Sequence, residues 1–219
     1  MTIPRAPLWL FITAAVIVAG SAAAQLVGIT LPFSQTPSSA VSDAPSASDP
    51  LFSEAELHDL WLDISDADWQ QLRAGFESNT YYRANLEWRG TRVTEIGVRS
   101  RGRATRNDSK PGLLLDINRF VDGQEILGLK AIVLDNLWLE PSMIKERVSM
   151  ALFRRMGLPA PRVAHARLDV GSERAYAGLY GLVETIDERF LTRVYGDDEG
   201  YLYEFERVDD YRFEDLGDA

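Results

Sequence analysis

Apolar and polar residues alternate over most of the chain beyond its first fifty residues, in short stretches separated by turn residues. Leu60, Leu62 and Ile64 illustrate the pattern, because they occupy every second position and would face one side of a strand. The pair Arg89-Gly90 marks a turn between two such stretches. The expected strands are residues 57–64, 80–88, 91–101, 113–117, 128–136, 163–170, 175–183 and 201–206.

A first helix is expected directly after the first strand. Ser65 is placed to cap its N-terminus, and Asp68 falls in its first turn. Trp69, Leu72 and Phe76 then give the helix one apolar face, which should pack on the core.

The second expected helix is the central one. It should begin at Pro141, since proline favours the first turn, and end at Gly157 before two prolines. Four apolar residues form the stripe that should pack on a sheet: Ile144, Val148, Ala151 and Leu152. A third, short helix is expected over residues 187–195, ending at Gly196.

These elements predict an α+β fold with one central helix packed on a twisted antiparallel sheet. Residues 51–219 are enough for one domain with a single core. Charged residues make up 26% of the chain and apolar residues 46%, as in ordinary globular proteins.

The first fifty residues are interpreted as an export segment followed by a linker. Arg5 precedes an apolar run with small residues up to Ala24, which predicts a secretory signal peptide cleaved after Ala24. The alternative is an uncleaved membrane anchor, because residues 8–31 carry no charge and are long enough to span a bilayer. Either alternative for residues 1–33 exports the rest of the chain, secreted or anchored. Residues 34–50 are rich in Ser and Pro and predict a disordered linker.

Charge is distributed unevenly along the chain. The net charge of −10 argues against binding to nucleic acid. Residues 89–110 nevertheless carry seven Arg or Lys and two acidic residues, which makes them a candidate anion site. The alternative is a hairpin with arginines on its solvated face. Residues 184–219 carry thirteen acidic residues and four Arg without the spacing of a calcium loop, which favours a solvated charge run.

The chain has no cysteine, which excludes disulfides and thiolate metal sites. Its only histidines are His58 and His165, so a metal site built from several histidines is not expected. The place of His165 within a strand favours a structural role over that of a catalytic base.

A series of motifs resembles the CotH family of spore-coat atypical protein kinases. The resemblance covers about residues 51–206 and corresponds to the first half of such a domain. The motifs are R-x-R-G from Arg99, a lone Lys110, G-L-K-x-x-x-L-x-N from Gly128, P-S-M-x-x-E-R from Pro141, G-x-P-A-P-R from Gly157, G-L-Y-x-L-V-E-x-I-D from Gly178 and G-x-L-Y from Gly200.

The resemblance implies a fold like the small lobe of a protein kinase, which binds ATP with a divalent metal, Mg²⁺ or Mn²⁺. Lys110 would contact the phosphates, and Glu146 would hold that lysine through an ion pair. Arg99 and Arg101 share one face of their strand and would point at the same anion. Glu184 would lie beside the adenine. Each role has a plain alternative. Lys110 would be an exposed turn lysine and Glu146 a surface glutamate. Arg99 and Arg101 would lie on a solvated face, and Glu184 would be an acid at a strand end.

The chain departs from the family pattern in two ways. After R-x-R-G the family usually has Asn-Ser-Ser, whereas this chain has Arg103-Ala104-Thr105. The N-N-Y-x-x-Y and W-D-x-D patterns, near which the family's catalytic and metal-binding aspartates lie, do not occur in the sequence. We therefore assign no catalytic or metal-binding residue and expect an N-terminal part of a CotH-like domain that is inactive by itself.

Two classes of function remain open. The first is an exported CotH-like kinase that phosphorylates a Ser/Thr-rich surface or coat protein. The second is a non-catalytic interaction module of the envelope or spore surface.

Overall fold

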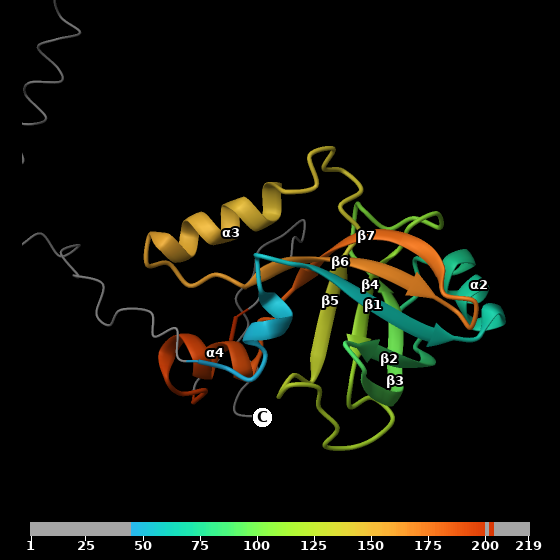
Figure 1. The fold of residues 1–219 in the computed structure, drawn as a ribbon, viewed down its shortest axis with the longest axis horizontal. Coiled ribbons are helices and arrows are strands. Elements are labelled where there is room, and N and C mark those ends of the chain that lie inside the picture. The colour runs from blue at the N-terminus through green and yellow to red at the C-terminus, as the bar shows by residue number, and fades with distance from the viewer. Residues whose placement is uncertain (1–44, 200–201, 204–219) are drawn as a thin grey trace, which may run out of the picture. The chain divides into compact units, whose positions relative to one another are not determined.

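Seven strands form one closed barrel in the computed structural model, which describes residues 45–199 and 202–203 (Figure 1). Around the barrel they follow the order β1-β2-β3-β4-β5-β7-β6. The strands are β1 (Leu57–Ile64), β2 (Tyr82–Trp88), β3 (Thr91–Arg101), β4 (Gly112–Asp116), β5 (Ala131–Asp135), β6 (Val163–Val170) and β7 (Ala175–Val183). The structure is therefore α+β, as the sequence predicts.

Several predictions concern residues outside the described part. The export segment over residues 1–33 lies there entirely, as do most of the linker and most of the strand expected over 201–206. The last residues of the expected linker are described, and they belong to the folded part. Ser48 is buried, and Asp49 begins the short 3-10 helix η1 (Asp49–Phe52). Within the described residues, no helix has the length and apolar character to cross a membrane.

The local strand predictions are largely confirmed. The bounds of β1, β3, β6 and β7 are those that the alternation of apolar residues predicts. Arg89 and Gly90 both have positive φ, 51° and 78°, which is the conformation of a two-residue turn that matches the twist of a hairpin. The turn between β2 and β3 is therefore set by its own residues.

The sheet is not antiparallel throughout, which corrects one part of the expectation. β1 runs parallel to β6, with Leu57 opposite His165 and Leu62 opposite Val170. The prediction was wrong because hairpin patterns identify only neighbours in the sequence, whereas β1 and β6 are far apart along the chain. This parallel pair closes the barrel and leaves no exposed sheet edge.

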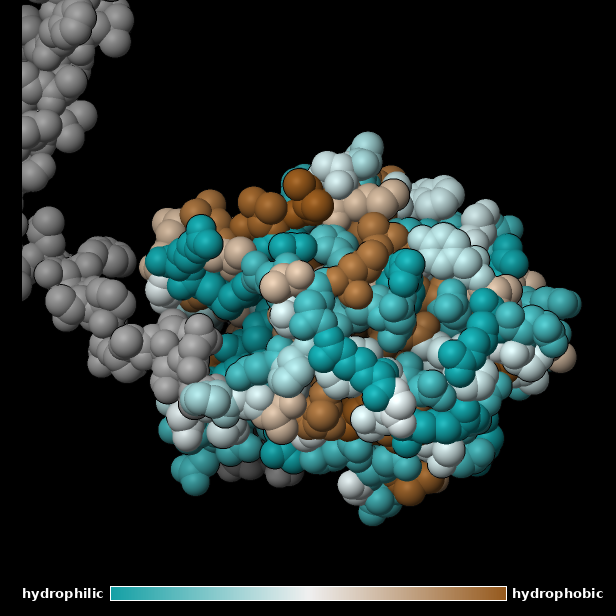
Figure 2. Space-filling model, viewed as in Figure 1, coloured by the Kyte–Doolittle hydropathy of each residue, from teal (hydrophilic) through white to brown (hydrophobic). Residues whose placement is uncertain are grey.

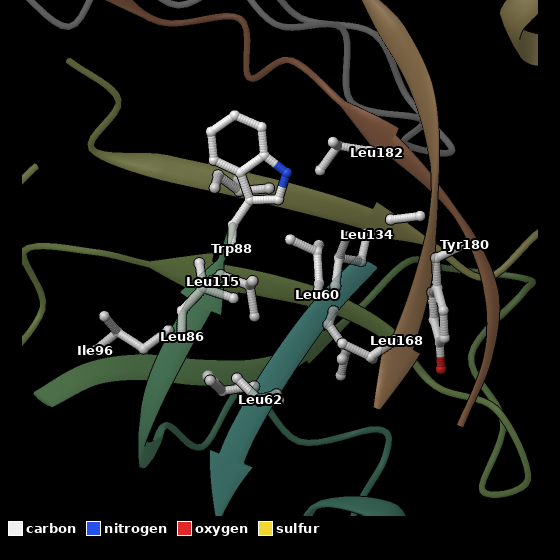
Figure 3. Close-up of a cluster of buried hydrophobic side chains, with 14 of the residues drawn as sticks. Leu60, Leu62, Leu86, Trp88, Ile96, Leu115, Leu134, Leu168, Tyr180 and Leu182 are labelled. Atoms are coloured by element: carbon white, nitrogen blue, oxygen red, sulfur yellow. The ribbon is translucent and has the colours of Figure 1, made fainter. Parts of the chain in front are cut away.

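The barrel interior is the core of the protein. Inward-facing side chains of the strands fill it, and α2 (Asp66–Ala74) contributes buried Leu72. The side chain of Ser65 accepts a hydrogen bond from the backbone N–H of Asp68 at 3.1 Å, so the predicted N-cap is confirmed. Figure 3 shows part of this cluster, with Leu60, Leu62, Leu86, Trp88, Ile96, Leu115, Leu134, Leu168, Tyr180 and Leu182 labelled.

The central helix α3 (Lys145–Arg155) differs most from the prediction. It begins four residues after Pro141, which instead lies in a turn closed by a 3.0 Å hydrogen bond from Met143 N–H to the Glu140 carbonyl. No residue of α3 is buried. Two residues of the expected packing stripe, Val148 and Leu152, are 57% and 53% exposed.

The closed barrel explains why the packing stripe of α3 was wrongly predicted. The inner face of the sheet is already filled by its own side chains, so only the outer surface remains for a helix. There α3 reaches a small apolar cluster of Val133, Val163 and Val183 through Met150. Figure 2 shows the remaining apolar side chains of α3 at the surface.

The last helix, α4 (Glu188–Tyr195), follows the prediction. Asp187 caps it by accepting hydrogen bonds from the backbone N–H groups of Arg189 and Phe190, at 3.0 and 3.2 Å. Gly196 ends it in the left-handed conformation, with φ of 87°.

We predict that the outer stripe of α3 contributes little to folding. Leu152→Gln should change the free energy of unfolding by less than about 0.5 kcal/mol, because the side chain is already half exposed. Leu115→Ala removes a fully buried side chain and should cost about 2–5 kcal/mol. Urea unfolding of both variants measures the difference. A comparable loss in the two would show that this face of α3 is covered in solution.

Candidate functional site

Charged side chains from four segments meet around the end of β5. Arg101 ends β3, Lys110 lies in the loop before β4, Asp135 ends β5 and Glu146 lies in the first turn of α3. The charge of Asp135 favours the charged form of Lys110, and the charge of Arg101 favours the charged form of Glu146. Two cations and two carboxylates are therefore gathered in one place by the fold.

Lys110 is held at its ammonium group. Nζ donates a hydrogen bond to the carbonyl of Leu179 at 2.6 Å and lies 5.0 Å from the centre of the Tyr180 ring. Burial lowers the pKa of Lys110, and the nearby Asp135 carboxylate partly opposes that shift. The side chain is thus not the freely solvated lysine of an ordinary turn.

Gly178 of β7 admits the side chain of Lys110. A Cβ at Gly178 would lie 2.9 Å from Cε of Lys110, and φ of +139° at this residue also disfavours any other amino acid. A Cβ at Gly181 would lie 3.5 Å from Oε2 of Glu146, which is an ordinary van der Waals distance, so the position of Glu146 does not require a glycine there.

Glu146 is partly buried between α3 and the barrel. Burial raises its pKa, the negative charges of Asp135 and Glu140 raise it further, and Arg101 lowers it. The direct ion pair that the family resemblance implies between Lys110 and Glu146 is not among the ion pairs of the described residues. Asp135 lies close enough to act on both groups.

The two arginines of the R-x-R-G motif have different surroundings. Arg99 donates to the Tyr81 hydroxyl and to Oδ1 of Asn79, each at 3.2 Å, so its guanidinium is engaged by neighbouring loops. Arg101 is close enough to Glu146 to lower the pKa of that carboxyl. The structure thus brings Arg101, but not Arg99, to the cluster.

Glu184 lies away from the cluster. It follows β7, five residues beyond Leu179, and about 17 Å further along an extended chain. Its buried carboxylate accepts hydrogen bonds from the Arg162 backbone N–H at 2.9 Å and from the guanidinium groups of Arg162 and Arg193, at 2.7 Å each. Arg162 also donates to Ser48 at 2.7 Å. In this structure Glu184 joins β7, α4 and the segment before η1.

His165 has the structural surroundings that its place in a strand favours. It is buried, and its Nε2 lies 2.5 Å from the carbonyl of Met143, while Nδ1 lies 3.4 Å from Nη1 of Arg147. The ring therefore ties the start of α3 to β6 and helps to place Glu146.

Sequence reasoning missed Asp135, the residue that links the two ends of the cluster. It also missed Asn136, which is fully buried directly after β5. The only signal available was a pair of polar residues that follows an apolar strand, Asp135-Asn136.

The cluster was tested against the nucleotide and metal that the family resemblance implies. Lys110 and Arg101 supply the cations that a phosphate group needs. Within the described residues, no three Asp, Glu or His lie close enough to form a metal site. These residues therefore fit a phosphate, and they do not supply the ligand set of a resident divalent metal.

A family model described as CotH kinase protein matches residues 98–218. The matched range contains Arg99, Arg101, Lys110, Glu146 and Glu184. No curated protein matches the chain significantly.

We predict that Glu184→Gln destabilises the fold by about 3–5 kcal/mol, because it removes the buried carboxylate that two largely buried arginines share. The matched control is Glu188→Gln, which breaks an exposed pair with Lys130 and should change stability little. Thermal and urea unfolding provide the measurement. Equal stability of the two variants would mean that the Glu184 pair is solvated.

A second prediction follows from the raised pKa of Glu146. Its charged form is disfavoured in the folded protein, so Glu146→Gln should stabilise the fold at neutral pH. The gain should vanish as pH falls below the ordinary glutamate value of about 4.3, where the carboxyl is protonated in both states. Unfolding measured from pH 3 to 8 tests this.

Glu140→Gln provides a control of opposite sign. A hydrogen bond from Ser142 lowers the pKa of Glu140, so this substitution should destabilise the fold at neutral pH. A Glu146 variant that is less stable than the native protein at pH 7 would contradict the assignment.

Proposed function

Because the chain belongs to the CotH family, we propose that its barrel domain binds ATP phosphates at the end of β5, as the nucleotide-binding part of an atypical Ser/Thr protein kinase. The observation that carries the proposal is that Asp135 acts electrostatically on both Lys110 and Glu146, and that Arg101 acts on Glu146. These residues come from separate segments of the chain.

The ammonium group of Lys110 suits this role. It can donate three hydrogen bonds, and the Leu179 carbonyl accepts one. Two donors therefore remain for phosphate oxygens. Positioning and charge stabilisation make up most of what a kinase site does, so a cation held in place before the ligand arrives is the feature required.

The two carboxylates define the form in which the nucleotide would bind. Asp135 and Glu146 would repel a bare polyphosphate at neutral pH. We therefore propose that ATP enters with its Mg²⁺ or Mn²⁺, which lowers that repulsion. Arg101 would contact the phosphates bidentately while remaining close to Glu146.

Phosphoryl transfer is proposed for the complete kinase site and not for the described residues alone. Transfer needs carboxylates that hold metal and one that accepts the hydroxyl proton. The proposed acceptor is a Ser/Thr-rich surface or coat protein. Residues 1–33 would bring the domain to it by export, as a cleaved signal or as a membrane anchor.

The second candidate function is a non-catalytic interaction module of the envelope or spore surface. The observation that favours it is the exposed apolar side of α3, where Ile144, Val148, Leu152 and Met156 recur at every fourth position. Nucleotide binding distinguishes the two candidates.

We predict that the full chain binds magnesium ATP in a calorimetric titration, and that Lys110→Ala weakens binding at least tenfold by removing the held cation. Lys130→Ala is the matched control, since Lys130 is an exposed lysine paired with Glu188. Its affinity should equal that of the native chain. A folded native chain that binds no ATP would reject this function and favour the interaction module.

A further inference from the structure

Both peptide groups of Lys110 are held by side-chain amides. The N–H group of Lys110 donates to Oδ1 of Asn107 at 2.7 Å, and its carbonyl accepts from Nδ2 of Asn136 at 2.9 Å. Strand β4 begins only at Gly112, so Lys110 stands outside the ladder of the barrel. Its backbone is therefore placed by two asparagines.

Asn136 uses both amide N–H groups and its oxygen in this arrangement. The residue is fully buried, directly after β5. Its amide also donates to the carbonyl of Thr105 at 2.8 Å, and its Oδ1 accepts from the N–H of Trp138 at 3.2 Å. A buried amide is costly unless it is satisfied, so these bonds fix Asn136 and the groups that it contacts.

Asn107 binds the same two residues from within the loop. Besides holding the N–H of Lys110, it donates from Nδ2 to the carbonyl of Thr105 at 3.0 Å. The carbonyl of Thr105 accepts from both asparagines, and Lys110 donates to Asn107 and accepts from Asn136. The loop is closed on itself by Asn107 and attached to the end of β5 by Asn136.

The far end of the Lys110 side chain is fixed independently. Its ammonium donates to Leu179, and its stem lies against Gly178. Lysine carries a flexible four-carbon stem, so a bond at Nζ alone would leave the backbone free to move. The amides and the β7 contacts together hold both ends.

We propose that Asn136 and Asn107 are positioning residues for Lys110. They keep its backbone at the end of β5, so that the ammonium stays between the Leu179 carbonyl and the Tyr180 ring. Neither asparagine contacts the phosphates in this proposal; they act through the lysine. Their effect on ligand binding rests on the proposed nucleotide site, whereas their effect on Lys110 itself does not.

The chain contains only three lysines, Lys110, Lys130 and Lys145, so each can be followed separately. Protein labelled with ¹³C-lysine gives one Hε–Cε signal set for each residue. In the native chain the Lys110 signals should titrate at lower pH than those of Lys130, and its two Hε protons should differ. Lys130 and Lys145 serve as internal references.

Asn107→Ala and Asn136→Ala should each release Lys110. Its two Hε signals should merge, and its titration should move up towards that of Lys130. Asn107→Asp keeps the acceptor for the Lys110 N–H but loses the donor to the Thr105 carbonyl, so the two Hε signals should stay distinct while the new charge raises the titration of Lys110. Asn118→Ala, in the loop after β4, is the matched control and should leave all three lysines unchanged. If Asn136→Ala does not fold, the partly exposed Asn107 decides the outcome.

Unchanged Lys110 signals in folded Asn107→Ala would overturn the proposal. ATP titration of the same variants forms the second arm, with an expected loss of about tenfold. If the variants release the Lys110 signals but the native chain binds no ATP, the positioning role holds and the nucleotide function is rejected. If the variants bind ATP more weakly but keep the native Lys110 signals, the positioning role is rejected and the nucleotide function holds.

Discussion

The parallel pairing of β1 with β6 is the constraint on which the rest of the structure depends. It closes the sheet, so inward-facing side chains of the strands meet one another and form most of the core, to which α2 adds Leu72. Charged groups can then lie only on the outer surface or where a strand ends. Strand β5 stops at Asp135, and there the loop with Lys110, the first turn of α3 and the glycines of β7 come together.

The sequence predicts the strands well because each strand is a local pattern. The turn residues 171–174 separate β6 from β7, and Arg89-Gly90 alone sets the turn after β2. The pair that closes the barrel is not local. β1 and β6 are far apart along the chain, and they pair only because the whole barrel buries their side chains. The predicted packing face of α3 was wrong for the same reason. Periodicity shows that a helix has an apolar side, but it does not show what that side contacts.

The residues of the candidate site were also only partly predictable from the sequence. Lys110, Arg101 and Glu146 could be named from motifs, and the fold brings them together. Glu184 was predicted from a motif in the same way, but its carboxylate forms ion pairs with Arg162 and Arg193. The chain spacing of these residues carries no information on that pairing. Which acid is free to act on a ligand is decided by tertiary contacts that no short motif contains.

The surroundings of Lys110 differ from those of a solvated turn lysine. The pKa of Lys110 is lowered and that of Glu146 is raised, so the fold disfavours the charge of both groups. Selection for stability alone would expose them or replace them. Instead, Gly178 makes room for the lysine side chain, and a buried asparagine binds the lysine backbone. Perturbed charges held by dedicated contacts are typical of sites that act on a ligand. The plain turn lysine accounts for none of these features.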